Sequence, residues 1–269
     1  MPASRRSLLL AERYRDGLSE LRGRATRALR GAWVVDPEDF DRSFAGWQAL
    51  AGATVAGIQG AGVTLTSSYL AAYLTSEKRE RTDVAFDPTP YVGRDRFGRL
   101  LARALSPAIA TAKVAVGQGA SVDQALAMAL NRALRIADDA MAHAPRQALS
   151  DAIRDRDDID GWRRLTRGTC AACMALAGQL QHEPMFEAHP GCQCVGAPSV
   201  VGVSERVPLP TFEDIFGALS VAEQDATYGP ERAQAMRDGV PPLDLIERNE
   251  LALGGTVITE RPVEQLKRR

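Results

Sequence analysis

The sequence predicts a mainly α-helical protein, with an elongated N-terminal helical bundle or hairpin and a smaller, zinc-stapled α+β module in its C-terminal half. Apolar residues recur every three or four positions over long stretches before residue 160. After residue 160 the chain becomes turn-rich and contains all four cysteines. The 269 residues are 45% apolar and 25% charged, which excludes collagen-like and wholly disordered chains. A net charge of -1 disfavours a dedicated nucleic-acid-binding protein.

These patterns divide the chain into five segments. The segments are residues 1–75 with the long N-terminal helices, 76–99 as a loop, 100–160 with central helices, 161–200 as the CxxC/HPxCxC zinc module, and 201–269 with a linker, short helices and a charged tail. The N-terminal apolar run is too short for the core of a signal peptide, so we expect no export.

The first long helix is predicted by one apolar stripe that ends before Gly31. The stripe consists of Leu10, Tyr14, Leu18, Leu21, Ala25 and Leu29. The opposite face is basic and carries Arg5, Arg6, Arg13, Arg15, Arg22, Arg24, Arg27 and Arg30. We interpret this face as solvated, with contact to nucleic acid or an acidic partner as the alternative.

The second helix is predicted from about Pro37 into the region of residues 69–74. Asp36 to Asp39 supply a cap, a first-turn proline and acidic side chains at the positive end of the helix dipole. The stretch Ser43 to Ser76 lacks charged side chains but is rich in Gly, Ala, Ser and Thr. We therefore expect a closely packed helix and no membrane span. The first two helices are expected to form a hairpin outside any compact core.

Two central helices follow, over about residues 100–116 and from Ser121 to about Ala144. Ser121 and Gln124 form a predicted capping box for the second of them. Pro145 is expected to begin a separate short helix, which places His143 near a helix end as a partner of the C-terminal dipole.

The C-terminal half is predicted to be smaller and less regular. The stretch from Trp162 to Thr166 favours a short strand. Thr211 is expected to start a short helix, and Ser220 with Glu223 forms a capping box for the next one.

The cysteine cluster is the most specific chemical signal in the sequence. Cys170 and Cys173 form a CxxC pair, and His189, Cys192 and Cys194 follow in HPGCQC. Thiolates with one imidazole at this spacing suit tetrahedral Zn²⁺. Two disulfides and reduced structural cysteines are the alternatives, and disulfides are disfavoured for a chain expected in the reducing cytoplasm. The sequence therefore predicts a zinc site.

Five candidate donors exceed the four that a closed tetrahedral site uses. We expect Cys170 and Cys173 to bind. We favour Cys192 over Cys194, because His189 and Cys192 repeat the two-residue gap of a zinc knuckle, although a turn in this segment would let either cysteine serve. His182 is interpreted as a solvated loop residue. A site with four protein ligands has no open position for substrate, and the sequence offers no catalytic or cofactor-binding residue, so we expect no enzyme activity.

Three segments occur in order in the C-terminal half, namely Trp162-Arg163-Arg164, GTCAACMALAG, and Phe186 followed by the HPxCxC motif. Together they resemble the phage Mu protein F-like (MuF-type) family of minor capsid or head morphogenesis proteins. LRGRATRALRGAWVVDPEDFDRSF, DPTPYVG and SVAEQDATYGPERAQAMRDGV are similar to the version found in phages of actinobacteria. The cysteine region alone is diagnostic.

The resemblance implies a structural virion component made in the host bacterial cytoplasm and located in the capsid interior or near the portal. Portal and major capsid proteins are then the expected partners, with homo-oligomers left open. A DNA-contacting protein packaged in the head, acting through the arginine-rich first helix, is the alternative. A zinc-dependent enzyme is the least favoured reading.

Overall fold

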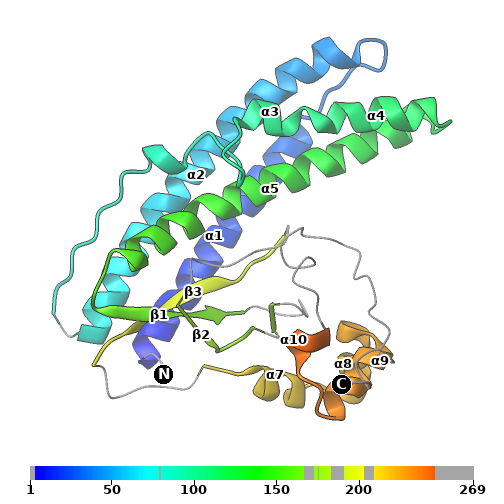
Figure 1. Cartoon of the computed structure of the whole chain (residues 1–269). Helices are drawn as coiled ribbons and strands as arrows, with labels where there is room; N and C mark the ends of the chain where they lie inside the picture. The colour runs from blue at the N-terminus through cyan, green and yellow to red at the C-terminus, as the bar shows by residue number, and fades with distance from the viewer. Residues whose placement is uncertain are drawn as a thin grey trace. The chain divides into compact units, whose positions relative to one another are not determined.

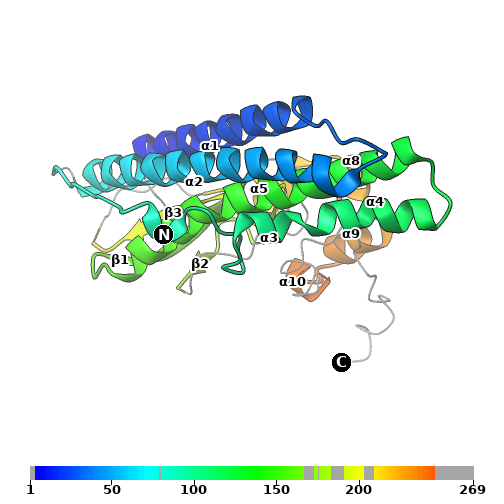
Figure 2. The same ribbon diagram turned by 90° about the horizontal axis from the view of Figure 1, so that it is seen from above.

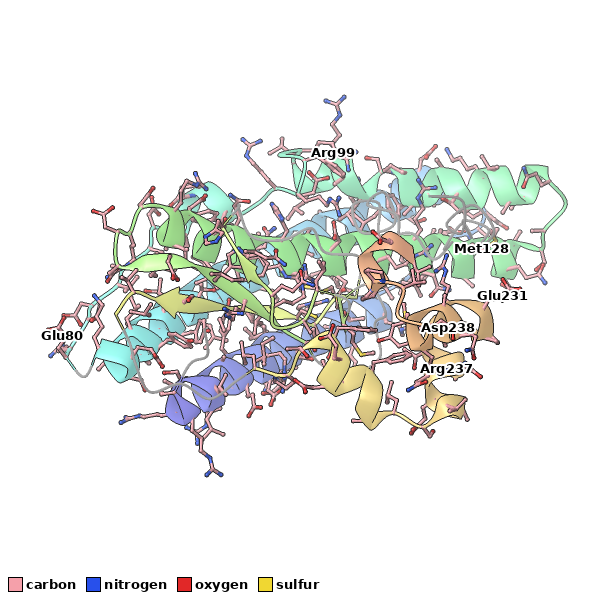
Figure 3. All side chains as sticks on the ribbon, turned by 60° about the horizontal axis from the view of Figure 1, so that its bottom comes forward. Glu80, Arg99, Met128, Glu231, Arg237 and Asp238 are labelled. Atoms are coloured by element: carbon pink, nitrogen blue, oxygen red, sulfur yellow. The ribbon has the colours of Figure 1, made fainter. Side chains whose placement is uncertain are left out.

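The computed structural model describes residues 4–78, 80–166, 173–174, 176–182, 191–202 and 209–245. The side chains drawn in Figure 3 belong to these residues. The chain divides into two compact units. The helical unit contains Arg13–Ala72 and Thr82–Asp151, and the sheet unit contains Met1–Glu12, Tyr73–Arg81 and Ala152–Arg269. The mainly α fold with a small C-terminal sheet confirms the predicted fold class.

The helical unit is built from long helices and two shorter ones. Their bounds are α1 Arg5–Gly31, α2 Phe40–Lys78, α3 Leu101–Leu105, α4 Pro107–Gly117 and α5 Val122–Arg154, with the 3₁₀ helix η1 at Thr89–Tyr91. Figures 1 and 2 both show α1, α2 and α5 running beside one another. The sequence predicted either a helical bundle or a hairpin, and the structure shows a bundle.

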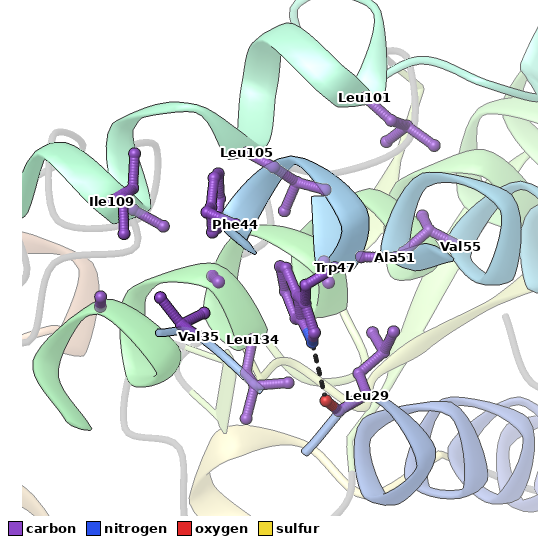
Figure 4. Close-up of a cluster of buried hydrophobic side chains, with 14 of the residues drawn as sticks. Leu29, Val35, Phe44, Trp47, Ala51, Val55, Leu101, Leu105, Ile109 and Leu134 are labelled. Atoms are coloured by element: carbon purple, nitrogen blue, oxygen red, sulfur yellow. Dashed lines mark hydrogen bonds between the residues drawn. The ribbon is translucent and has the colours of Figure 1, made fainter. Parts of the chain in front are cut away.

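The bundle core joins residues from all five helices. Leu29, Trp47, Leu105, Ile109 and Leu134 belong to one buried cluster, in which the Trp47 indole Nε1 donates to the Leu29 carbonyl oxygen at 3.0 Å (Figure 4). The expectation of a hairpin outside any compact core is therefore wrong. Buried alanines on α2, α4 and α5 let the helix backbones approach closely, which explains why apolar stripes that looked peripheral are internal.

Pro145 lies inside α5, so the predicted break before it is wrong. Gly62 on α2 faces the proline ring, and a Cβ atom at Gly62 would lie 3.4 Å from Pro145 Cγ. Packing between α2 and α5 therefore offsets the backbone hydrogen bond that proline cannot donate. His143 consequently lies within the helix and not near its end, and burial lowers the pKa of its imidazole. Its expected role as a dipole partner is also wrong.

The arginine-rich face of α1 is less basic than its composition indicates. Arg22 is buried and donates to both carboxylate oxygens of Asp138, from Nε at 2.9 Å and from Nη2 at 2.6 Å. Exposed Arg24 forms an ion pair with Glu20 one turn earlier. Arg22 therefore has to be removed from the predicted solvated face, while Arg13 and Arg27 stay exposed.

By length and composition, α2 is the one helix of the described ranges that could cross a membrane. Its buried residues Phe44, Trp47, Ala51 and Val55 recur at three- and four-residue intervals and belong to the bundle core.

Among its described residues, the sheet unit has three antiparallel strands in the order β2-β1-β3. Their bounds are β1 Ile159–Leu165, β2 Leu180–Gln181 and β3 Val195–Val200, so the predicted strand at Trp162 to Thr166 corresponds to the end of β1. Pro198 lies on β3, an edge strand, where its missing N–H is tolerated, and its carbonyl accepts the Tyr73 hydroxyl at 2.9 Å.

Short helices complete the described part of the sheet unit. They are α7 Phe212–Ala218, α8 Val221–Tyr228, α9 Pro230–Arg237 and α10 Pro242–Leu245. Thr211 and Ser220 each cap a helix through a capping box, as predicted for Ser220. Phe212, Phe216 and Tyr228 pack with Met174 in a separate buried cluster. The predicted charged tail lies outside the described residues from position 246 onward.

Candidate metal centre

Three cysteines converge in the interior of the sheet unit. The Sγ atoms of Cys173, Cys192 and Cys194 all lie within 4.8 Å of one another. Their residues are 1%, 2% and 3% exposed, so solvent is nearly excluded from the cluster. Among the residues that the structure describes, this is the one group of His, Cys, Asp or Glu donors with the spacing of a metal site. The cluster is therefore the candidate metal centre.

A tight turn beside β1 positions Cys173. The Cys173 carbonyl accepts from the Leu176 N–H at 3.3 Å, and Ala177 forms an isolated bridge with Arg164 of β1. Gly178 closes the turn at a φ of 69°, where a Cβ atom would lie 2.9 Å from the carbonyl oxygen of Pro210. Glycine fits both requirements, the left-handed backbone and the close approach. The turn thus fixes Cys173 against the sheet.

Cys192 and Cys194 lie just before β3. Gly191 precedes them with a φ of 81°, and β3 begins at Val195, which pairs with Leu165 of β1. The segment 192–194 is not part of the regular strand. Both thiols reach the cluster, so the geometry gives no preference for Cys192 over Cys194. This is the turn arrangement that the sequence left open.

The spacing of the sulfur atoms suits a shared metal ion. The Cys173 and Cys192 Sγ atoms are 3.6 Å apart. Two thiolates bound to one tetrahedral Zn²⁺ at about 2.3 Å would be separated by about 3.8 Å. A disulfide would need about 2.05 Å. Cys173, Cys192 and Cys194 form no disulfide in the structure, so their arrangement favours a metal centre over the disulfide alternative.

Arg164 is a component of the centre that the sequence analysis did not identify. It lies on β1 with 2% of its surface exposed, and its Nη1 donates to Cys173 Sγ at 3.4 Å. A guanidinium is a permanent cation, so it favours negative charge on the neighbouring sulfur. In a strand Arg164 lies on the same face as Trp162, which could have indicated an inward arginine, but its partner becomes visible only in three dimensions.

The protonation of the thiols depends on their mutual contacts. The hydrogen bond with Cys173 lowers the pKa of the Cys194 thiol, whereas its hydrogen bond with Cys192 and its burial raise it. The balance raises the pKa of Cys194 to about 11. Without a metal the Cys194 thiol is therefore protonated at neutral pH. A cation that binds all three sulfurs has to displace protons from them.

The structure describes His182 but not the two remaining predicted donors. Cys170 and His189 lie outside the described residues. His182 is exposed and its Nδ1 lies 2.6 Å from the Asp160 carbonyl oxygen, so it stands apart from the described cluster.

Comparisons with protein family models, curated proteins and solved structures find no significant match to this chain. The interpretation of the site therefore depends on its own chemistry. Three buried thiols beside a buried guanidinium form a soft, nearly solvent-free donor set. The thiols can bind a metal ion and so hold β1, β3 and the Cys173 turn together.

Proposed function

We propose that the chain is a phage minor capsid, or head morphogenesis, protein of the MuF type, a non-enzymatic structural component that acts near the portal or the capsid interior. The observation that carries the proposal is the pairing of the motif resemblance with a buried thiol cluster at the same residues, Cys173, Cys192 and Cys194. A closed metal centre of this kind stabilises a small module and has no role as a hydrolytic site.

Zinc is the metal that this donor set favours. Soft thiolates with a fourth sulfur or nitrogen ligand suit Zn²⁺ in tetrahedral geometry, and zinc adds no redox chemistry. Elemental analysis of protein purified under reducing conditions without chelators is expected to give one zinc per chain. Metal content well below one per chain would contradict the zinc site without contradicting the capsid assignment.

The capsid assignment is tested by the protein composition of phage particles and assembly intermediates. We expect the chain in purified heads, and we expect a pull-down from infected cells to recover the portal or the major capsid protein. Particles that lack the chain, together with a pull-down that recovers neither partner, would refute the assignment.

A DNA-contacting protein inside the head is the second candidate, supported by exposed Arg13 and Arg27 on α1. The burial of Arg22 and the Arg24–Glu20 pair weaken it, because both reduce the free positive charge of that face. Binding through such a face would be weak, sequence-independent and steeply salt-dependent. Retention of DNA alone in the pull-down would favour this candidate. Turnover of a small substrate would favour the remaining one, a zinc enzyme.

A further inference from the structure

One turn of the helical unit exposes two large apolar side chains. The turn runs from Gly93 to Leu101 and is called the Phe97 turn below. Phe97 is 67% exposed and Leu100 is 60% exposed. Single exposed apolar side chains are common on protein surfaces. A pair of them indicates a binding surface more strongly when the backbone that presents them is held in one conformation. Hydrogen bonds inside the turn and hydrogen bonds to α2 hold the backbone of the Phe97 turn.

The Asp95 carboxylate organises the interior of the Phe97 turn. Asp95 is buried, and its Oδ1 accepts from the backbone N–H groups of Phe97 at 3.0 Å and Arg99 at 2.9 Å. Its Oδ2 accepts from Arg99 Nε at 2.8 Å. The Asp95 N–H donates to the Arg99 carbonyl at 2.9 Å, which closes the turn. One buried side chain therefore determines the conformation of the exposed tip.

Gln59 of α2 anchors this turn to the bundle. Its Oε1 accepts from the Gly93 N–H at 2.8 Å, and its Nε2 donates to the carbonyls of Arg94 at 2.7 Å and Ala140 at 3.0 Å. Gln59 is 1% exposed, so these bonds are shielded from water. A tip held in this way loses little conformational entropy when it binds. This pre-organisation is typical of an anchor residue in an interface.

Arginines flank the exposed Phe97 ring, although Arg96 and Arg99 also form ion pairs with Asp139 and Asp95 of the same chain. The guanidinium carbons of Arg96 and Arg99 lie 4.9 Å and 5.1 Å from the centroid of the Phe97 ring, and Arg94 is exposed beside them. Figure 3 shows Arg99 at the periphery of the ribbon. An aromatic centre with arginine at its rim is enriched in protein interfaces. The matching partner surface has an apolar side chain flanked by carboxylates.

The chain carries such a surface itself, in the connection between α1 and α2. Val34 is 79% exposed, and the carboxylates of Asp36, Glu38 and Asp39 are exposed next to it. This segment, residues 34–39, is called the acidic turn below. It is ordered, because Asp36 Oδ1 accepts from the Glu38 N–H at 2.9 Å and Asp39 Oδ1 accepts from the Arg42 N–H at 3.1 Å. The acidic turn complements the Phe97 turn in charge and in its exposed apolar side chain.

The two turns of one chain are too far apart to meet. The acidic turn ends where α2 begins at Phe40, whereas the Phe97 turn is anchored at Gln59, 19 residues further along α2 (59 − 40). At 1.5 Å per residue this is about 28 Å along the helix axis. We propose that the Phe97 turn of one chain docks onto the acidic turn of a second copy. The contact is heterologous, so it leaves one turn of each kind available for further copies.

The contact is small, because each side consists of one turn, so self-association is weak and depends on local concentration. It also depends on ionic strength, because exposed charges carry its specificity. The inference is independent of the proposed capsid function. It applies wherever many copies of the chain are brought together.

The test uses the zinc-loaded full chain in sedimentation velocity at about 50 mM and about 500 mM salt. The expected result is concentration-dependent association at low salt that is weakened at high salt. Phe97→Ala and Glu38→Lys are each expected to weaken association at least tenfold. An equimolar mixture of the two variants is expected to form a 1:1 heterodimer, because one retains an intact acidic turn and the other an intact Phe97 turn.

Met128→Ala is the matched control, because Met128 on α5 is 51% exposed and lies in neither turn (Figure 3). It is expected to associate like the wild type. Leu100→Ser provides a second Phe97-turn variant if Phe97→Ala fails to fold by circular dichroism. A wild-type chain that stays monomeric at about 0.5 mM and low salt would overturn the proposal. Unchanged association of the variants, or no heterodimer in the mixture, would also overturn it.

Discussion

Replacing Arg164 by Met tests whether its guanidinium supports the thiolate centre. The change keeps a long side chain but removes the cation 3.4 Å from Cys173 Sγ. A hydrogen bond to a charged group contributes about 1.5–3 kcal/mol. By the relation of 1.4 kcal/mol per tenfold change, the dissociation constant for Zn²⁺ should rise by about 10- to 100-fold.

The measurement is a competition titration of Zn²⁺ between the protein and a chromophoric chelator. Arg237→Met is the control, because Arg237 lies in the same unit and donates to Gln224 and Asp225 instead of a thiol. Arg164→Lys, which keeps the charge without the planar guanidinium, should lose less affinity than Arg164→Met. Wild-type zinc affinity in a folded Arg164→Met protein would refute the role assigned to the guanidinium.

Three further changes test the fold. Gly178→Ala should destabilise the sheet unit by about 1–3 kcal/mol in urea denaturation, because of its positive φ and the close Pro210 carbonyl. Trp47→Phe should cost about 1–3 kcal/mol, because it leaves the buried Leu29 carbonyl without its indole donor, and Leu50→Ala, at an exposed position, offers a surface comparison on the same helix. A hydrogen bond from Arg156 holds the pKa of the Asp158 carboxyl below its usual value. Its contribution to the stability of the fold is therefore present above about pH 4 and is lost as the pH falls further. Asp158→Asn should flatten this part of an acid-unfolding curve, and an unchanged curve would contradict the assignment.

Local sequence signals predicted those elements whose cause is local. The Ser121 and Ser220 capping boxes are confirmed by their reciprocal hydrogen bonds. The apolar stripe of α1 is confirmed by the burial of Tyr14, Ala25 and Leu29. In each case the interacting residues lie within a few positions of one another, so residue type and spacing carry the information.

The features that the sequence did not predict depend on contacts between distant segments. Pro145 continues a helix because Gly62 lies opposite its ring, and Arg22 is buried because Asp138 lies on a different helix. The cysteine spacing predicted donors for a metal centre, but not that Cys192 and Cys194 both face Cys173. It also did not predict Arg164, since an arginine in a strand gives no indication of which side chain it will contact.

Met174, next to Cys173 in the chain, packs among the aromatic side chains of α7 and α8. Metal binding and the assembly of this aromatic cluster therefore share one short piece of backbone, and thermodynamic linkage makes the effect reciprocal. If a bound ion stabilises the packing of the C-terminal helices, that packing increases the affinity for the ion by the same free energy. If the proposed centre binds zinc, a change at Phe216, which lies far from every cysteine in the sequence, is expected to change the affinity for the metal.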